Sequence, residues 1–337
     1  MEILSTSASD LERAARALRS GGLVAVPTET VYGLAADAFN PDALAHIFEA
    51  KRRPRFDPLI VHIDRLNLLD SLVKRDALGP RGRDRLEQLA RTLWPGPLTL
   101  ILPKKPAVPD LATSGLDTVA VRFPAHPVMQ ALIAQAGPLA APSANPFGYL
   151  SPTCAQHVVQ QLGQRVDFII DGGPCDLGVE STVLDLTGDE ACILRPGGLP
   201  RAAIEDCIGP VALIDRSQEH PTAPGQLKSH YAPHAPLSLF PRGGLDPATA
   251  KRGDVLLYFS QTDAARALAG RPLPDGVQLR VLSESGDQKE AAQRLFALLH
   301  ELDDSRAARI LAEEVPSGGL GDAVNDRLRK ACAKNKG

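Results

Sequence analysis

The alternation of short apolar segments with helical segments restricts the fold of this chain more than any other feature of its sequence. Segments of helical length, Pro127–Ala136 and Thr153–Leu162, are each followed by a glycine. This order predicts an α/β fold around a twisted sheet with flanking helices, and the unequal connection lengths predict a mixed sheet. The apolar segments with the length of buried strands are Leu59–Ile63, Leu98–Leu102, Val119–Phe123, Leu139–Ala141, Phe168–Ile170 and Thr182–Leu186.

Capping signals near the N-terminus predict the first two helices. Ser9 and Glu12 have the spacing of a capping box, which predicts a helix that begins there and ends before the next glycine. The segment GLVAVPTET then predicts a short strand that runs into a turn. Asn40 predicts the cap of a second helix, which ends near Lys51.

The sequence predicts two domains joined by a linker. The first domain is expected over residues 1–210. Residues 211–236 are expected to form the linker, because Pro, His and small polar residues predominate over residues 217–236 without periodicity, after a short apolar strand at Val211–Ile214. Residues 237–337 are expected to form a smaller α/β domain, with strands at Val255–Ser260, Val277–Leu282 and Arg309–Glu313 and a long helix near Asp287–Leu302.

Composition and charge exclude several classes of protein. The formal net charge of −3 over 337 residues argues against a globally basic nucleic-acid coat. The five cysteines have no metal-ligand spacing, so reduced thiols are expected instead of disulfides or a zinc site. The N-terminus does not resemble a signal peptide and no apolar run has bilayer length, so a cytoplasmic protein without membrane contact is expected.

Polar residues follow the first predicted strand. Thr28, Glu29 and Thr30 supply two hydroxyls and a carboxylate where that strand ends. Ligands of α/β sheets collect at such strand ends, although an ordinary turn has the same composition.

A basic segment ends the second predicted helix. Residues 51–55 carry four cations within five positions. The helix dipole favours cations there, and such a run is often only a solvated face. Pro54 and Pro58 stiffen the segment, however, and a stiff basic loop suits a polyphosphate because its charges need little reorganisation.

Arg122 interrupts the apolar strand Val119–Phe123. A buried arginine needs a carboxylate partner, which comes either from the protein or from a ligand. Thr118 offers a hydroxyl near the same place. Ser143 and Asn145 share an orientation if their segment is extended, and both can donate to phosphate oxygens, although a proline-bracketed turn has the same pattern.

Common nucleotide and catalytic motifs are missing from the sequence. It contains no Walker glycine loop, GxGxxG, GxSxG or HExxH. A bound nucleotide would therefore occupy a less common type of site. His62, within the apolar run LIVHI, is by itself typical of a packed core residue.

Seven motifs, in order over about residues 5–205, together resemble one family. They are PTETVYGLAADA, KRRPRFDPLIVHI, WPGPLTLIL, GLDTVAVRFPAHP, PLAAPSANPFGYLSPT, IIDGGPCDLGVESTVLDL and ILRPGG. They look like the YrdC-like domain of threonylcarbamoyl-AMP synthases. The linker sequence HYAP, residues 230–233, resembles the long form of that family, which continues into a small Rossmann-like domain.

The resemblance implies roles for individual residues. Those expected to be catalytic around the nucleotide phosphates are Lys51, Arg53, Ser143 and Asn145. Positions that match ATP contacts are Arg53, Asp57, Thr118, Ser143, Ser151, Arg195 and Tyr231. Positions that match the surroundings of threonine are Thr30, His62, Arg122, Ala141 and Ser181. No protein metal ligand is implied.

The resemblance also implies a reaction. An L-threonylcarbamoyladenylate synthase, which is a nucleotidyltransferase, joins L-threonine, bicarbonate and ATP into threonylcarbamoyl-AMP and releases pyrophosphate. ATP would be a substrate, accompanied by Mg2+ held largely through the phosphates. The product would pass to a tRNA threonylcarbamoyl-transferase complex for N6-threonylcarbamoyladenosine formation at position 37 of tRNAs that read ANN codons. Weak RNA binding is a further expectation.

Three alternatives stay open at this point. An RNA-binding or translation-related protein without catalysis could use the basic segment, but near-neutral charge and 4% aromatic residues oppose it. A carbamoyl transferase of the hydrogenase-maturation type would bring zinc-finger cysteine pairs and an acylphosphatase domain, and the sequence has neither. The third is a regulatory protein that binds adenylate without turnover, and pyrophosphate release that requires threonine, bicarbonate and ATP together would exclude it.

Overall fold

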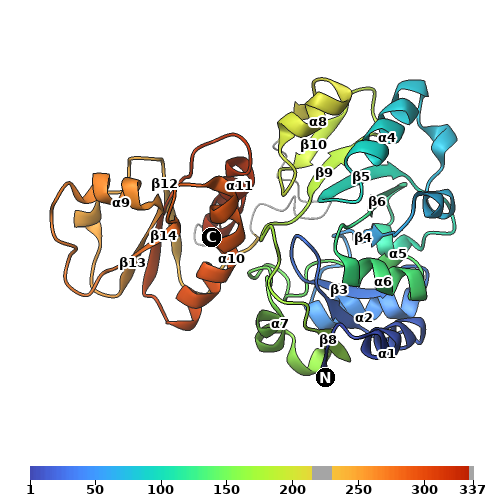
Figure 1. Ribbon diagram of the computed structural model, residues 1–337, viewed down its shortest axis with the longest axis horizontal. Coiled ribbons are helices and arrows are strands. Elements are labelled where there is room, and N and C mark those ends of the chain that lie inside the picture. Colours follow the sequence, from blue (N-terminus) through green and yellow to red (C-terminus); the bar gives the residue numbers. More distant parts are fainter. Residues whose placement is uncertain (215–229, 334–337) are drawn as a thin grey trace. The chain divides into compact units, whose positions relative to one another are not determined.

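The computed structural model describes residues 1–214 and 230–333, which form two compact units (Figure 1). The first unit contains Met1–Phe147, Ser151–Asp176 and the described residues from Glu180 to residue 214. The second unit contains the described residues from His230 onward, together with two short segments from earlier in the chain, Gly148–Leu150 and Leu177–Val179. Of the predicted linker, residues 215–229 lie outside the described residues.

The first unit is built on a mixed sheet of 11 strands, as the unequal connections predicted. Parallel and antiparallel pairs of neighbouring strands both occur in it. In spatial order the strands are β1 (Glu2–Leu4), β8 (Phe168–Ile170), β2 (Val24–Val26), β3 (Gly33–Asp37), β7 (Leu139–Ala140), β4 (Ile60–His62), β6 (Thr118–Arg122), β5 (Leu98–Pro103), β9 (Thr182–Asp185), β10 (Cys192–Arg195) and β11 (Ala212–Leu213).

Helices pack on both faces of this sheet. One face forms the larger core with α2 (Pro41–Lys51), α4 (Pro80–Thr92), α5 (Asp110–Thr113), α7 (Ala155–Gln161) and α8 (Arg201–Ile208). On the other face, α1 (Ala8–Arg19) and α6 (Pro127–Ala136) pack against strands β2, β3 and β7. A short helix, α3 (Leu69–Leu72), follows β4.

The sheet face that α1 and α6 cover over β2, β3 and β7 continues over β4, β5, β6 and β9, where strand residues form a second, small apolar cluster. Ile60, Ile101, Ala120 and Val183 come from β4, β5, β6 and β9. Because side chains alternate along a strand, Arg122 projects from the same face as Ala120. On this part of the sheet, the apolar cluster therefore lies next to the polar side chains at the strand ends.

The cap of α1 differs from the prediction. The helix begins at Ala8, and Ser7 instead of Ser9 is its N-cap, with its hydroxyl accepting a hydrogen bond from the Asp10 backbone N–H. Ser7 and Asp10 repeat the capping-box spacing, so the pattern was assigned two residues too late. The predicted cap of α2 is confirmed, since Asn40 accepts from two backbone N–H groups of its first turn.

The second unit has a fully parallel sheet. Its strands are, in spatial order, β12 (Leu237–Phe240), β15 (Arg309–Glu313), β13 (Asp254–Ser260) and β14 (Gln278–Ser283). The helices are α9 (Gln261–Leu268), α10 (Gln288–Asp304) and α11 (Gly321–Ala333). Within this unit Tyr149 donates a hydrogen bond of 2.5 Å to Asp303, and the Ala232 N–H donates to the Gly148 carbonyl.

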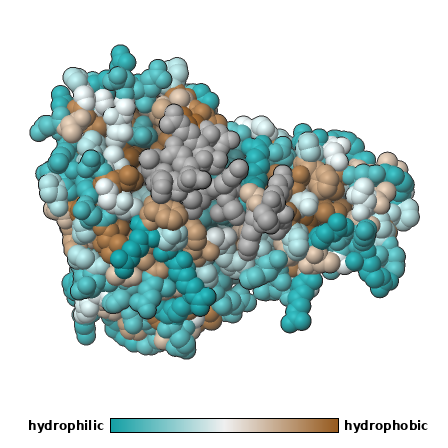
Figure 2. All heavy atoms as spheres, turned by 180° about the vertical axis from the view of Figure 1, so that it is seen from behind, coloured by the Kyte–Doolittle hydropathy of each residue, from teal (hydrophilic) through white to brown (hydrophobic). Residues whose placement is uncertain are grey.

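The face of the molecule drawn in Figure 2 is largely hydrophilic. On the face drawn in Figure 2, hydrophilic residues are spread widely and hydrophobic residues show in patches between them. Among the described residues, no helix combines the length and the apolar character that crossing a bilayer requires.

Gly197 provides a test of how tightly the strand ends pack. A Cβ at this position would lie 2.3 Å from the Ser181 carbonyl carbon and 2.4 Å from the Glu180 carbonyl oxygen. Both are backbone atoms, so β9 would have to shift. We expect Gly197→Ala to lower the free energy of unfolding by about 1–3 kcal/mol, measured by urea denaturation.

Gly188→Ala is the matched control, because a Cβ there meets no atom closer than 3.7 Å. We expect it to change the free energy of unfolding by less than about 0.5 kcal/mol. Equal losses in the two variants would show that the close packing around Gly197 is wrong.

Candidate functional site

Arg122 is the centre of a polar group at one end of the first unit's sheet. It is the last residue of β6, and the strand register pairs it with His62 of β4 and Thr99 of β5. Directly paired residues project from the same face, so these three side chains are neighbours. All three are buried.

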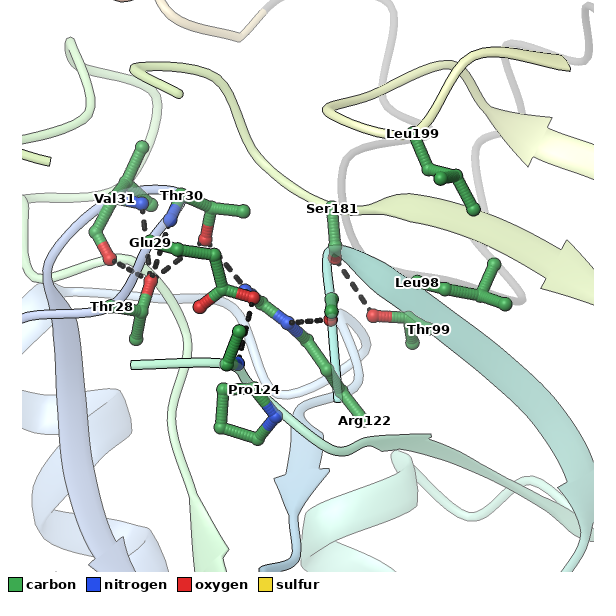
Figure 3. A network of polar contacts seen from close by, with 12 residues as sticks. Thr28, Glu29, Thr30, Val31, Leu98, Thr99, Arg122, Pro124, Ser181 and Leu199 are labelled. Atoms are coloured by element: carbon green, nitrogen blue, oxygen red, sulfur yellow. Dashed lines mark hydrogen bonds and ion pairs between the residues drawn. The ribbon is translucent and has the colours of Figure 1, made fainter. Parts of the chain in front are cut away.

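The loop after β2 supplies the partners of Arg122 (Figure 3). The Arg122 Nη2 lies 2.7 Å from Glu29 Oε1, and Nη1 donates to the Thr30 hydroxyl at 2.9 Å. Thr28 holds the loop in place, since its hydroxyl donates to the Val31 carbonyl and lies 2.8 Å from the Thr30 hydroxyl. The carboxylate that the sequence demanded for Arg122 is therefore found within the protein, at Glu29.

A second chain of contacts connects Thr99 to Ser181 and Arg195. The hydroxyls of Thr99 and Ser181 are 2.8 Å apart. Arg195, the last residue of β10, donates to the Ser181 carbonyl at 2.8 Å and to its hydroxyl at 3.1 Å. Ser181 thus joins the predicted threonine residues to a predicted ATP residue.

His62 is neutral in this environment. Burial, together with the positive charge of Arg122, lowers the pKa of His62 to about 3. Its Nδ1 lies 3.2 Å from the Ile60 carbonyl, which can only accept, so Nδ1 carries the proton. A backbone hydrogen bond to Leu139 also holds the ring.

Glu29 remains charged despite its burial. Burial by itself would raise the pKa of Glu29, but the charge and hydrogen bond of Arg122 and the Ala125 N–H together hold that pKa below its ordinary value. The two buried charges therefore neutralise each other, and the site carries no large net charge.

A second buried ion pair lies in the basic segment. Arg53 Nη2 is 2.8 Å from Asp57 Oδ2, and the Arg53 guanidinium also donates to the carbonyls of Asp57 and Pro58. Burial raises the pKa of Asp57, against the opposing charges of Arg53, Lys51 and Arg195. The predicted ATP residues Arg53, Asp57 and Arg195 are thus electrostatic neighbours.

Lys51 points into the protein. Its Nζ donates to the backbone carbonyls of Ser143 and Asn145, the latter at 2.5 Å. Burial, reinforced by the charge of Arg53, lowers the pKa of Lys51 well below its ordinary range. Lys51 therefore holds the Ser143–Asn145 loop.

The shared orientation of Ser143 and Asn145 was predicted on the condition that their segment is extended. The segment is not extended there, because the Asn145 N–H donates to the Ser143 carbonyl and closes a tight turn. Asn145 is fully buried and donates to the Pro146 carbonyl, whereas Ser143 is half-buried. Proline on either side favours this turn over a strand.

The remaining predicted residues of the first unit surround the same face. Thr118 begins β6 and projects from the Arg122 face, about 13 Å away along the strand. Ala141 follows β7, and its N–H donates to the Ile60 carbonyl. Ser151 is buried and donates to Glu180 at 2.5 Å. Thr118 thus lies at the opposite end of β6 from Arg122.

Tyr231 belongs to the second unit and is described there. Its ring is buried, with the Arg327 guanidinium 4.9 Å from its centroid and the Phe296 ring at 5.6 Å. Its backbone φ is 62°, a left-handed conformation that is uncommon for tyrosine. The nucleotide contact expected of Tyr231 stays a prediction.

The sequence analysis missed three polar residues of the site. Glu29 was noted only as part of a polar turn, and Thr99 and Glu180 were not singled out. Each contacts a predicted residue, namely Arg122, Ser181 and Ser151. Thr99 is a hydroxyl residue inside the apolar strand LTLIL, which is the signal that could have revealed it.

Within residues 1–214 and 230–333, no group of three or more His, Cys, Asp or Glu side chains is arranged to hold a metal ion.

The fold and site define a two-unit α/β protein with buried cations grouped at strand ends. A family model described as "Telomere recombination" matches residues 16–197, and one described as "Threonylcarbamoyl-AMP synthase, C-terminal domain" matches residues 199–333. The chain belongs to the threonylcarbamoyl-AMP synthase family, which is a family of nucleotidyl-transferring enzymes. The predicted family, enzyme class and fold class are confirmed.

Individual relatives match over almost the whole chain. The threonylcarbamoyl-AMP synthase of Pyrococcus abyssi is 43% identical and covers 94% of this chain and 92% of its own length. That of Bacillus subtilis is 40% identical and covers 98% and 94%. The crystal structure of P. abyssi Sua5 complexed with L-threonine has a TM-score of 0.85 at 39% identity and covers 98% of this chain and 97% of its own.

The Arg122–Glu29 pair predicts a large stability effect. Glu29→Gln removes the charge that compensates a buried guanidinium, so we expect the free energy of unfolding at neutral pH to fall by about 3–5 kcal/mol. Glu12→Gln is the control, because Glu12 pairs with Arg16 at 3.1 Å on the exposed surface. It should cost less than about 1 kcal/mol.

The same pair predicts a pH dependence. Since the pKa of Glu29 is lowered in the folded state, its stabilising contribution is present above the ordinary value of 4.5 and is lost as the pH falls through the folded-state value. Urea denaturation of wild type and Glu29→Gln should therefore show a difference that shrinks in acid. A constant difference from neutral to acidic pH would contradict a charged Glu29.

Proposed function

We propose that this chain joins L-threonine, bicarbonate and ATP into threonylcarbamoyl-AMP with release of pyrophosphate. The observation that carries the proposal is Arg122, a buried cation at a strand end with donors to spare. A guanidinium has five N–H groups. Arg122 donates to the Gly96 carbonyl and the Thr30 hydroxyl, and its Nη2 forms the ion pair with Glu29. The N–H groups left over are suited to the carboxylate of an amino acid.

Threonine binds at the Arg122 end of the site. Arg122 takes its carboxylate, and Glu29 keeps the guanidinium in place. The neutral imidazole of His62 and the hydroxyls of Thr30 and Ser181 are suited to the amine and hydroxyl of threonine. The Ala141 backbone completes the surroundings.

The nucleotide lies between the basic segment and Arg195. Arg53, Asp57 and Arg195 are electrostatic neighbours, which supports a place for the triphosphate there. Lys51 holds the loop that contains Ser143 and Asn145. Thr118, Ser151 and Tyr231 are proposed as further ATP contacts from the family resemblance.

The reaction needs no covalent attachment to the protein. The threonine amine combines with bicarbonate and loses water, which gives a carbamate. A carbamate oxygen then attacks the α-phosphorus of ATP, the bond to the β-phosphate oxygen breaks, and pyrophosphate leaves. Positioning and electrostatic stabilisation supply the catalysis. Mg2+ enters as part of the ATP substrate, because phosphates are its ordinary ligands and the described residues offer no protein cage.

The product serves a later step of tRNA modification. We propose that it is passed to a tRNA threonylcarbamoyl-transferase complex, which forms N6-threonylcarbamoyladenosine at position 37 of tRNAs that read ANN codons. This places the protein in the cytoplasm, with at most weak RNA binding of its own.

Substrate omission tests the reaction. Purified protein should release pyrophosphate, and yield threonylcarbamoyl-AMP by mass spectrometry, only when threonine, bicarbonate and ATP are all present. Pyrophosphate release without threonine, or binding of ATP without any turnover, would contradict the proposal.

Variants of the basic segment test the site. We expect Arg53→Ala to lower turnover by about a hundredfold or more, because it removes a buried charge beside the phosphates. Ser143→Ala removes only a half-buried hydroxyl and should lower turnover about tenfold while the protein stays folded.

Arg55→Ala is the matched control for both variants, since Arg55 is an exposed cation of the same segment. It should leave turnover within about twofold of wild type. Normal turnover in both Arg53→Ala and Ser143→Ala would place the phosphates elsewhere.

A further inference from the structure

The second unit contains a cavity that the proposed reaction does not use. Its volume is about 360 Å3, within the range of small-molecule sites. It is lined by the loop after β12 (residues 243–247), by four residues of α9 and the turn after it, by Arg271, and by Glu313 at the end of β15. All of these lie beyond the carboxyl ends of the parallel strands.

The cavity lies at a change of direction in the sheet. The chain passes from β12 over β15 to β13, continues to the edge strand β14, and returns to β15 between them. The helix after β13, α9, packs on one face, and α10 and α11 lie on the other (Figure 1). In open parallel sheets such a switch point opens a crevice at the strand ends, and ligands bind there.

Glu313 gives the cavity a specific acceptor. It is 4% exposed, and its Oε1 accepts from the Gly243 N–H. No hydrogen-bond or ion-pair partner of its Oε2 exists among the described residues. Burial and the nearby charge of Asp263 raise the pKa of Glu313. The unpaired oxygen of this carboxylate can accept a hydrogen bond from a ligand donor, such as a hydroxyl.

Arginines give the rim a place for an anion. Arg266 and Arg271 both line the cavity, and their side chains are 66% and 59% exposed. Arg266 is oriented by Asp263, and Arg271 lies 3.8 Å from Asp246. The carboxylate of Glu313 lies at a strand end, whereas the two arginines lie on the rim of the cavity. A ligand that binds both therefore has hydroxyls at one end and a negative charge at the other.

We propose that this cavity binds a nucleoside phosphate, with the ribose hydroxyls on Glu313 and the phosphate on Arg266 and Arg271. The loop Gly243-Gly244 allows close approach, because Gly243 has φ of 78° and neither residue has a side chain to fill the entrance. The site belongs to the second unit alone, and it is distinct from the ATP site proposed for the first.

Hydrogen exchange of the full chain tests the proposal with a local readout. AMP should slow exchange of the backbone amides in residues 241–247 and in α9. Adenosine alone and inorganic phosphate alone should give much less protection at the same concentration. Protection confined to the first unit, no protection in α9, or equal protection by inorganic phosphate would each overturn the proposal.

Three variants assign the contacts. Arg266→Ala and Glu313→Gln should each raise the AMP concentration that gives half-maximal protection of residues 241–247 by about tenfold. Arg252→Ala is the control, because Arg252 is an exposed arginine of the same unit that pairs with Asp275 away from the cavity lining. It should behave as wild type, and equal behaviour of all three variants would overturn the proposal.

The outcome is separable from that of the proposed reaction. Arg266→Ala should retain wild-type pyrophosphate release with the three substrates, because Arg266 is not part of the first unit's site. If the wild-type protein releases no pyrophosphate with the three substrates, the proposed reaction is rejected, but AMP-dependent protection of residues 241–247 still supports the site in the second unit.

Discussion

The site of the first unit depends on the ion pair between Arg122 and Glu29. A guanidinium at the end of an apolar strand is costly to bury, and the pair is stable only because Glu29 is 2.7 Å away and Thr30 accepts a further hydrogen bond. The loop after β2 must therefore fold onto β6 before either charge is satisfied. This contact fixes the Glu29–Thr30 loop against His62 and Thr99, so the arrangement of the polar group follows from one requirement of electrostatics.

Local sequence patterns were sufficient for most of the architecture. Strand-length apolar runs predicted β4 to β9 within one or two residues, and Asn40 marked the start of α2. Several elements had no such signal. β3 (Gly33–Asp37) was hidden in a motif interpreted as a turn, and β1 is a strand only because it pairs with β8, far along the chain. The need of Arg122 for a carboxylate was predicted, but the partner was not, since a contact across more than ninety residues leaves no local pattern.

The basic segment shows why a run of cations cannot be interpreted from composition. Lys51 and Arg53 are buried, whereas Arg52 and Arg55 are exposed. The division arises where α2 ends, because Arg52 takes a left-handed conformation with φ of 50° and turns the chain. Half of the run therefore supports the interior of the site, and the other half is the solvated face that a charge run usually forms. Charged residues around the cavity of the second unit are divided in the same way, because Glu313 is buried at a strand end and Arg266 is exposed on the rim.

The central claim is that Arg122 receives the carboxylate of an amino acid. Isothermal titration calorimetry of the full chain with L-threonine and with L-threoninol, which lacks only the carboxylate, tests this claim most directly. The account predicts that threonine binds and that threoninol binds at least about a hundredfold more weakly, because threoninol has no carboxylate to accept charge-assisted hydrogen bonds from the remaining N–H groups of Arg122. Equal affinities for the two compounds would contradict it.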